Sequence, residues 1–98
     1  TYLYIVDREE RLVGVVSLRD LVLASPDDEM AAIMEDDVVE VTADVDEDEV
    51  GRIMTKYDLL ALPVVDEERR LLGIVTLDDA LEAVVPDDWK QRLPRIYR

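Results

Sequence analysis

Two stretches of this chain repeat each other at a constant distance, and that repetition limits its fold more than any other feature. Residues 3–20 read LYIVDREERLVGVVSLRD, and residues 62–79 read LPVVDEERRLLGIVTLDD. The offset is 59 residues throughout, without a gap, and ten of the eighteen positions are identical. Such self-similarity predicts two copies of one structural unit.

Each copy has the pattern of a β-hairpin followed by a helix. Two runs rich in β-branched residues flank a charged turn, at 3–6 and 12–16 in one copy and at 62–65 and 71–75 in the other. Ser17 and Thr76 then stand three residues before an aspartate, which predicts a capped helix start. We expect the apolar positions of the last helix to face the core, namely Leu77, Ala80, Leu81 and Val84.

The segment between the copies supplies further elements. Met30, Ile33 and Met34 have helical spacing, and residues 38–42 have the composition of a short strand. Asp46 is the expected N-cap of a helix whose apolar stripe is Val50, Ile53, Met54 and Tyr57. The second unit therefore reads strand, helix, strand, strand, helix. The first begins midway through this order, so the predicted fold is α+β with the opening strand and helix of the first repeat missing.

Charge and composition exclude several classes of protein. Residues 1–89 hold all 25 acidic residues and 7 basic ones, whereas residues 90–98 hold four basic residues and no acid. An acidic body repels a phosphate backbone, so we expect no nucleic-acid partner. No apolar run approaches the roughly 18 residues of a membrane span, and no signal peptide opens the chain. Any contact with a membrane is therefore expected in another part of a longer protein.

Catalysis has little support in the residues present. The chain has no cysteine and no histidine, which removes disulfides, the usual zinc sites and serine triads. Paired carboxylates such as Asp78, Asp79 and Glu82 remain, but no nucleophile elbow or Gly-rich phosphate loop accompanies them. We expect the chain not to be an enzyme.

The repeated motif resembles the CBS domain family over almost the whole chain. An apolar residue, Pro-Val-Val-Asp and then Gly-apolar-Val-Ser/Thr-x-x-Asp stand at 62–66 and 73–79, and again at 3–7 and 14–20 with Tyr4 in place of the proline. The resemblance implies tandem CBS repeats (a Bateman module) related by a pseudo-twofold axis. Its expected parts are a partial first repeat at 1–25, an inter-repeat helix and linker at 26–37, a second repeat at 38–85 and a basic tail at 86–98.

A closer resemblance is to the cytosolic CBS region of MgtE-type magnesium transporters. Val-Ser-Leu-Arg-Asp-Leu at 16–21, the acidic run before Val50 and Tyr57-Asp58 carry it. It implies a regulatory module at the cytoplasmic face of the cell membrane that senses intracellular Mg²⁺ and gates ion flux. The implied partners are a second copy in a homodimer and, in the parent chain, a membrane transport domain or an MgtE-type N-terminal domain.

The same resemblance names the candidate metal ligands: Asp46, Asp48, Asp58, Asp79 and Glu82. Asp79 and Glu82 are also i, i+3 on one helical face, where their like charges crowd each other and a divalent cation would relieve the repulsion. Magnesium suits facing surfaces with few carboxylates and retained waters. Calcium or manganese are alternative ions, and stabilisation of helix starts is the alternative role for Asp46, Asp48 and Asp79.

A second expected ligand is ATP or another adenine nucleotide. Similarity to ATP-binding CBS pairs implies contacts from Tyr2, Arg19, Asp20, Leu59 and Pro63. Tyr2 would stack on the base, Arg19 would pair with phosphate and Asp20 would take the ribose hydroxyls. The family often has an aromatic residue where Leu59 stands, and leucine would weaken the stacking.

Other functions remain open at this point. The chain is alternatively an adenine-nucleotide sensor that regulates another protein, a soluble MgtE-like protein without a transport domain, or a dimerisation scaffold. The tail departs from the transporters. With Trp89, Tyr97 and its four basic residues, it is expected to lie against anionic lipid or against the acidic body, or to be a disordered end.

Overall fold

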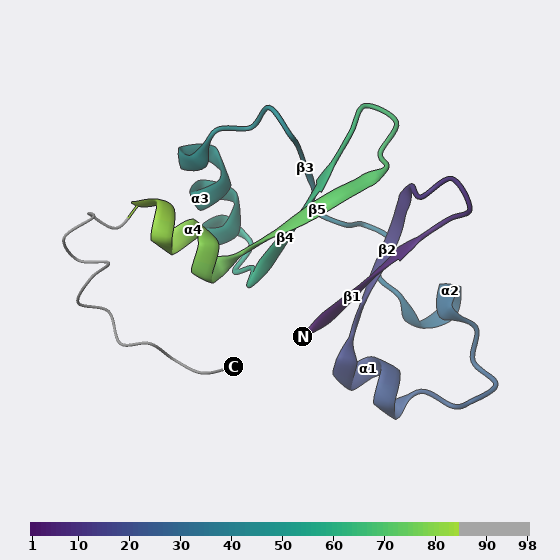
Figure 1. Cartoon of the computed structure of the whole chain (residues 1–98). Coiled ribbons are helices and arrows are strands. Elements are labelled where there is room, and N and C mark those ends of the chain that lie inside the picture. Colours follow the sequence, from purple (N-terminus) through teal and green to yellow (C-terminus); the bar gives the residue numbers. More distant parts are fainter. Residues whose placement is uncertain (85–98) are drawn as a thin grey trace.

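Two related units follow one another along the chain, and the computed structural model describes them over residues 1–84 (Figure 1). The first unit comprises β1 (Tyr2–Val6), β2 (Leu12–Ser17) and α1 (Leu18–Leu23), followed by a connecting segment that contains α2 (Met30–Ile33). The second unit comprises β3 (Val41–Thr42), α3 (Glu47–Lys56), β4 (Ala61–Val65), β5 (Leu71–Thr76) and α4 (Leu77–Val84). The predicted tandem arrangement of hairpins and helices is confirmed. The predicted tail at 86–98 lies outside the described residues.

The two hairpins have the same register. β1 pairs antiparallel with β2 from Tyr2–Ser17 onward, and β4 pairs antiparallel with β5 from Ala61–Thr76 onward, with an irregularity before the last pair in each. β3 adds a parallel strand to β4, so the second sheet has the order β3-β4-β5. The expected strand at 38–42 is shortened to its last two residues.

Helices α1 and α4 begin with the same hydrogen bond between a backbone amide and a side-chain hydroxyl. The Asp20 amide donates to Ser17 Oγ at 3.0 Å, and the Asp79 amide donates to Thr76 Oγ1 at 3.3 Å. The hydroxyl of Ser17 or Thr76 thereby satisfies a donor that has no partner within its helix, as the sequence predicts. Asp46 caps α3 in the same way, accepting from the Glu49 amide at 2.8 Å.

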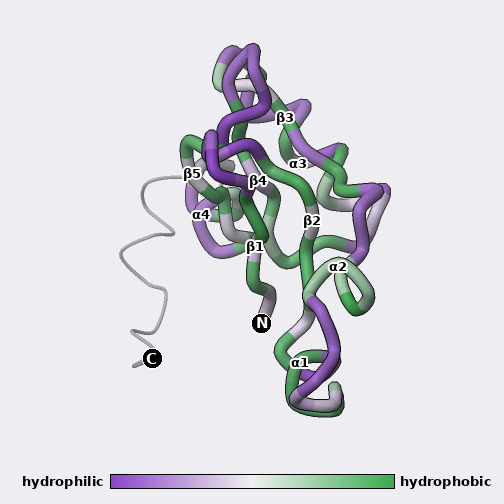
Figure 2. Tube along the Cα trace, turned by 90° about the vertical axis from the view of Figure 1, so that its right-hand side faces the viewer, coloured by the Kyte–Doolittle hydropathy of each residue, from purple (hydrophilic) through white to green (hydrophobic). Residues whose placement is uncertain are grey.

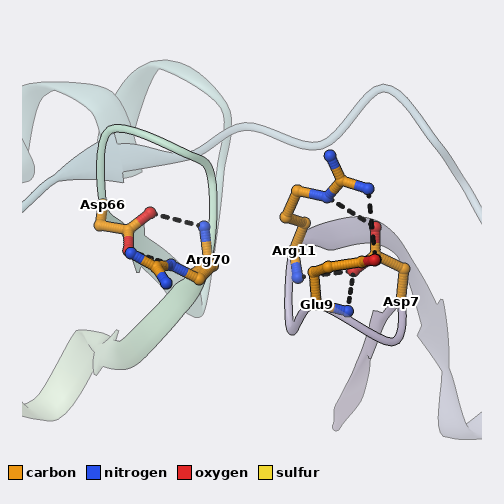
Figure 3. A network of polar contacts seen from close by, with 5 residues as sticks. All are labelled: Asp7, Glu9, Arg11, Asp66 and Arg70. Carbon is orange, nitrogen blue, oxygen red and sulfur yellow. Dashed lines mark hydrogen bonds and ion pairs between the residues drawn. The ribbon is translucent and has the colours of Figure 1, made fainter.

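Each hairpin turn is organised by one aspartate (Figure 3). Asp7 Oδ1 accepts from the Glu9 and Arg11 amides, both at 2.9 Å, and Asp7 Oδ2 accepts from Arg11 Nε at 2.8 Å. In the second unit, Asp66 Oδ1 accepts from the Arg70 amide and Asp66 Oδ2 from Arg70 Nε, at 2.8 and 2.7 Å. The two turns are therefore equivalent down to individual atoms.

The turns also join the two units. The Leu12 amide donates to the Arg69 carbonyl at 2.8 Å, and the Leu71 amide donates to the Glu10 carbonyl at 2.9 Å. Leu12 is equivalent to Leu71, and Glu10 is equivalent to Arg69, at the offset of 59 residues. Each of the two hydrogen bonds is therefore the symmetry counterpart of the other, as the predicted pseudo-twofold axis requires. Both accepting residues, Glu10 and Arg69, have a φ of 66°, in the left-handed region. We call this pair of hydrogen bonds the seam.

The core lies mainly in the second unit. Val41, Val50, Met54 and Leu62 form a buried cluster between α3 and the sheet. Leu62 is fully buried, whereas its counterpart Leu3 is 40% exposed, with no equivalent of β3 and α3 over it among residues 1–84. The expectation that the apolar face of α4 is buried is wrong for Leu77 and Leu81, which are exposed, while Ala80 is half-buried against the core.

The connecting segment packs against β2. Val15 and Glu35 exchange backbone hydrogen bonds at 2.9 and 2.8 Å, which places Met34 over Gly14. A Cβ at Gly14 would collide with the Met34 side chain and lie 3.2 Å from the Glu35 carbonyl oxygen. A Cβ at the equivalent Gly73 would meet no atom within 4 Å.

We therefore expect Gly14→Ala and Gly73→Ala to have opposite effects on stability. Gly14→Ala should lower the free energy of unfolding by about 1–3 kcal/mol through overpacking. Gly73→Ala should raise it by about 0.5–1 kcal/mol, since alanine loses less backbone freedom than glycine in a strand. Urea denaturation of both variants measures the difference. Equal effects would contradict the observed packing of Met34 over Gly14.

The aspartate turns predict an acid-dependent loss of stability. Hydrogen bonds, led by that from the Arg11 amide, lower the pKa of Asp7. Partial desolvation raises the pKa of Asp66. Hydrogen bonds from the Arg70 amide and side chain and from the Glu68 amide outweigh this effect, so the pKa of Asp66 is also lowered overall. A carboxyl whose pKa is lower in the folded state stabilises the fold above its unfolded value, near 3.9, and that contribution is lost as the pH falls through the folded pKa.

Replacing both turn aspartates should remove part of this acid sensitivity. Asp7→Asn with Asp66→Asn keeps one of the two oxygen acceptors in each turn and removes the titratable charge, so its melting temperature should fall less than that of the wild type between pH 5 and pH 2. Thermal unfolding followed by circular dichroism measures this. Asp36→Asn with Glu67→Gln makes the same charge change at exposed positions and should retain the wild-type pH dependence. Parallel pH profiles for the turn variant and the wild type would refute the prediction.

Candidate functional site

Tyr2 and Arg19 line one hollow beside the first unit. Tyr2 reaches it from the start of β1, and Arg19 reaches it from the first turn of α1. The hollow measures about 550 Å³, and Thr1, Ser17, Leu18, Val22 and Leu23 complete its lining. The structure thus brings together the expected base-stacking aromatic residue and the expected phosphate-binding cation. Asp20 follows Arg19 on α1, where it is exposed and its backbone amide donates a hydrogen bond to Ser17 Oγ.

A second hollow continues from Tyr2 toward the second unit. It measures about 380 Å³ and is lined by Thr1, Tyr2, Tyr4, Leu60, Ala61, Ile74 and Thr76. Partial burial raises the pKa of Tyr4, and its interaction with Tyr2 adds to the rise. The Tyr4 phenol is therefore protonated at neutral pH and available as a hydrogen-bond donor. We call the two hollows on either side of Tyr2 the first cleft.

The expected wall residues occupy different places. Leu59 is half-buried and packs against the core of the second unit, and Pro63 is almost fully buried in β4. Leu60 and Ala61, which sequence reasoning missed, are the residues that line the cleft beside Tyr2. The repeat contained a usable signal, because the offset of 59 pairs them with Thr1 and Tyr2.

The five candidate metal ligands do not gather within one chain. Asp46 and Asp48 lie at the start of α3, whereas Asp58 follows its end with a φ of 54°. At a rise of about 1.5 Å per residue, Asp46 and Asp58 are separated by about 18 Å, too far to bind one ion. Over residues 1–84, no three carboxylates are arranged to hold a metal ion.

Acids from two different helices line one small cavity. Glu47 of α3 and Asp79 of α4 line a space of about 290 Å³, together with Thr42, Ala43, Val45, Val50, Val64, Val75 and Ala80. Sequence reasoning named Asp79 here but not Glu47. Glu47 and Val50 are i, i+3 on α3 and therefore lie on the same side of the helix. Because Val50 is a core residue, this spacing would have indicated that Glu47 lies on the side that faces the core.

Helices α3 and α4 form an open groove on the surface of the second unit. Met54, Leu77, Ala80 and Leu81 supply its apolar lining, and Glu47, Asp48, Arg52 and Lys56 supply charged groups at its margin. Its volume is about 760 Å³, and Leu81 is 51% exposed in it. Glu82 also lies on α4 and is exposed. The candidate acids Asp48, Asp79 and Glu82 thus belong to the two helices that flank this apolar surface.

The chain matches one protein-family model and several curated proteins. The CBS domain family model matches residues 1–27 and 30–86. Among curated proteins, the chain is 54% identical over 83 residues to the magnesium transporter MgtE of Thermus thermophilus, and 43% identical over 84 residues to MgtE of Bacillus subtilis. These matches cover 85% and 86% of the chain but only 18% and 19% of the relatives. The chain thus spans less than a fifth of these transporters.

A solved structure shows the same fold. The cytosolic domain of the Mg²⁺ channel MgtE in complex with ATP is 54% identical and superposes with a TM-score of 0.82, covering 85% of this chain and 34% of that one. Within residues 1–84, no helix has the length and apolar character needed to cross a membrane. The repeated hairpin-helix units, their seam and the match over nearly the whole sequence show that this chain belongs to the CBS domain family.

Proposed function

We propose that this chain is the regulatory module of a magnesium transporter, which senses intracellular Mg²⁺ and an adenine nucleotide to control ion flux. The observation that carries the proposal is the 54% identity to the MgtE of Thermus thermophilus, which extends over the same two units. The cytosolic domain of an MgtE channel with that identity binds ATP. The parent chain would then place this module at the cytoplasmic face of the cell membrane.

The first cleft supports the nucleotide part of the proposal. An aromatic ring and a guanidinium that line the same hollow offer stacking for a base and charge-assisted hydrogen bonds for phosphate. Leu60 and Ala61 form an apolar wall on the other side of Tyr2. Asp20 remains the proposed partner of the ribose hydroxyls.

The acidic helices support the magnesium part. In the proposed homodimer, the apolar groove between α3 and α4 would face a second copy, and Asp48, Asp79 and Glu82 would approach the opposing acids. Asp46 and Asp58, at the two ends of α3, would contribute to separate sites. Carboxylates of two facing surfaces, completed by water, match the oxygen ligands and sparse protein coordination that Mg²⁺ prefers. The ion would neutralise repulsion that otherwise separates the copies.

Magnesium should therefore stabilise the folded chain in a saturable way. An ion at about a hundred times its dissociation constant adds about 2.7 kcal/mol, which corresponds to a rise of roughly 10–20 °C in the melting temperature of a domain this size. Thermal unfolding across MgCl₂ concentrations, at constant ionic strength set with NaCl, measures the rise. Parallel series with CaCl₂ and MnCl₂ distinguish the ions, and sedimentation velocity reports dimer formation.

A pair of isosteric variants tests the assignment of ligands. Asp79→Asn with Glu82→Gln should abolish most of the rise, whereas Asp36→Asn with Glu67→Gln removes the same charge elsewhere and should preserve it. If both variants respond like the wild type, or if MgCl₂ gives no more than the NaCl control, the magnesium part of the proposal fails.

ATP binding should depend on Arg19. Titration calorimetry of the chain with ATP should show at least a tenfold weaker affinity for Arg19→Gln, equivalent to about 1.4 kcal/mol. Arg8→Gln changes the net charge equally but lies at the turn after β1, so its affinity should match the wild type. An equal loss in both variants would mean that only overall charge matters. Nucleotide binding without any magnesium response would favour a nucleotide sensor that regulates another protein.

A further inference from the structure

The two hollows of the first cleft differ in charge. A guanidinium lines the hollow of about 550 Å³, which we call the Arg19 hollow. Among residues 1–84, no charged side chain lines the hollow of about 380 Å³, which we call the Thr76 hollow. Thr1 and Tyr2 line both hollows. The cleft therefore has a cationic part and an uncharged part, just as a nucleotide has anionic phosphates and an uncharged base.

Apolar residues form much of the wall of the Thr76 hollow. Leu60, Ala61 and Ile74 contribute to it from the second unit. Hydrophobic residues predominate along β1 and β4, the strands that supply Tyr2 and Ala61 (Figure 2). The volume of this hollow lies within the range of about 300–1,000 Å³ that is usual for small-molecule sites. Its size and its apolar wall suit a flat, uncharged group such as a nucleobase.

Two hydroxyl groups in the Thr76 hollow are available to a ligand. Tyr4 is two residues from Tyr2 on β1, so both side chains lie on one face of the strand. Tyr4 is half-buried, and within residues 1–84 its phenol has no hydrogen-bond partner. Thr76 Oγ1 accepts from the Asp79 amide, and its own hydrogen can still donate. A partly desolvated phenol without a partner favours a ligand that supplies one.

The internal repeat indicates that a nucleotide would bind in one direction. The offset of 59 residues relates Ser17 to Thr76 and Arg19 to Asp78. The first turn of α4 thus carries a carboxylate where the first turn of α1 carries a guanidinium. Phosphate is attracted to Arg19 and repelled by Asp78. These charges distinguish two ends of the cleft that the pseudo-twofold axis would otherwise make alike.

We propose that the base of the nucleotide occupies the Thr76 hollow, where Tyr4 Oη and Thr76 Oγ1 form hydrogen bonds with its edge, and that the phosphates occupy the Arg19 hollow. Tyr2 lies where the two hollows meet and stacks on the base. Tyr4 then recognises the base, whereas Arg19 recognises only the phosphates. This inference rests on the proposed binding of an adenine nucleotide.

Two ligands and two variants test the separate roles of Tyr4 and Arg19. ATP and adenosine share the base, but only ATP carries phosphates. Tyr4→Phe should weaken the binding of both ligands by the same factor, about two- to tenfold, because one neutral hydrogen bond is lost. Arg19→Gln should weaken ATP binding at least tenfold and leave adenosine binding unchanged. Titration calorimetry measures the affinity of each variant for each ligand.

Tyr57→Phe is the matched control for Tyr4→Phe. It removes the same hydroxyl at the end of α3, where Tyr57 is 49% exposed and lines neither hollow. Its affinities for ATP and adenosine should equal those of the wild type. Circular dichroism at the temperature of the titrations should show every variant folded, so that a loss of binding is not a loss of folding.

The other results contradict the proposal in different ways. If Tyr4→Phe binds both ligands as tightly as the wild type does, the phenol does not recognise the base. If Arg19→Gln weakens adenosine binding as much as ATP binding, the base lies in the Arg19 hollow. If the wild type binds neither ligand, the proposed nucleotide function fails together with this inference, whereas the first two results leave that function standing.

Discussion

Two main-chain hydrogen bonds determine how the rest of the molecule is arranged. The Leu12 amide and the Arg69 carbonyl form one, and the Leu71 amide and the Glu10 carbonyl form the other. Because they cross between hairpin turns, they hold the two units in an antiparallel pair and place the start of β1 near the residues that precede β4. The first cleft, with Tyr2 between Arg19 and Leu60, follows from that placement.

The two units share a backbone but differ in their surroundings. Leu3 and Leu62 are the same residue at equivalent positions, yet only Leu62 is covered by α3 and β3. Gly14 and Gly73 are likewise equivalent, yet only Gly14 lies beneath Met34. Differences in exposure between equivalent positions therefore mark the surfaces where a further segment, ligand or subunit is expected to bind.

The repeat made most of the fold predictable, because its hairpins, caps and helix starts depend on local contacts such as that of Ser17 with Asp20. Predictions failed where distant packing decides the outcome. Periodicity identified the apolar face of α4. Whether Leu81 on that face is buried depends on which segment packs against it, and the spacing of apolar residues carries no information about that segment. The association of Tyr2 with Arg19 was predictable from family resemblance. That Leu60 lines the cleft, while Leu59 packs against the core, could be predicted only with the register of β4 known.

The left-handed residues at the seam have an evolutionary consequence. Glu10 and Arg69 carry side chains of opposite charge, yet both have a φ of 66° and both present their carbonyl oxygens to the other unit. The pairing thus depends on the backbone, and two side chains as different as those of glutamate and arginine are compatible with it. After a gene duplication, the two halves could diverge in their binding surfaces without losing their ability to recognise each other.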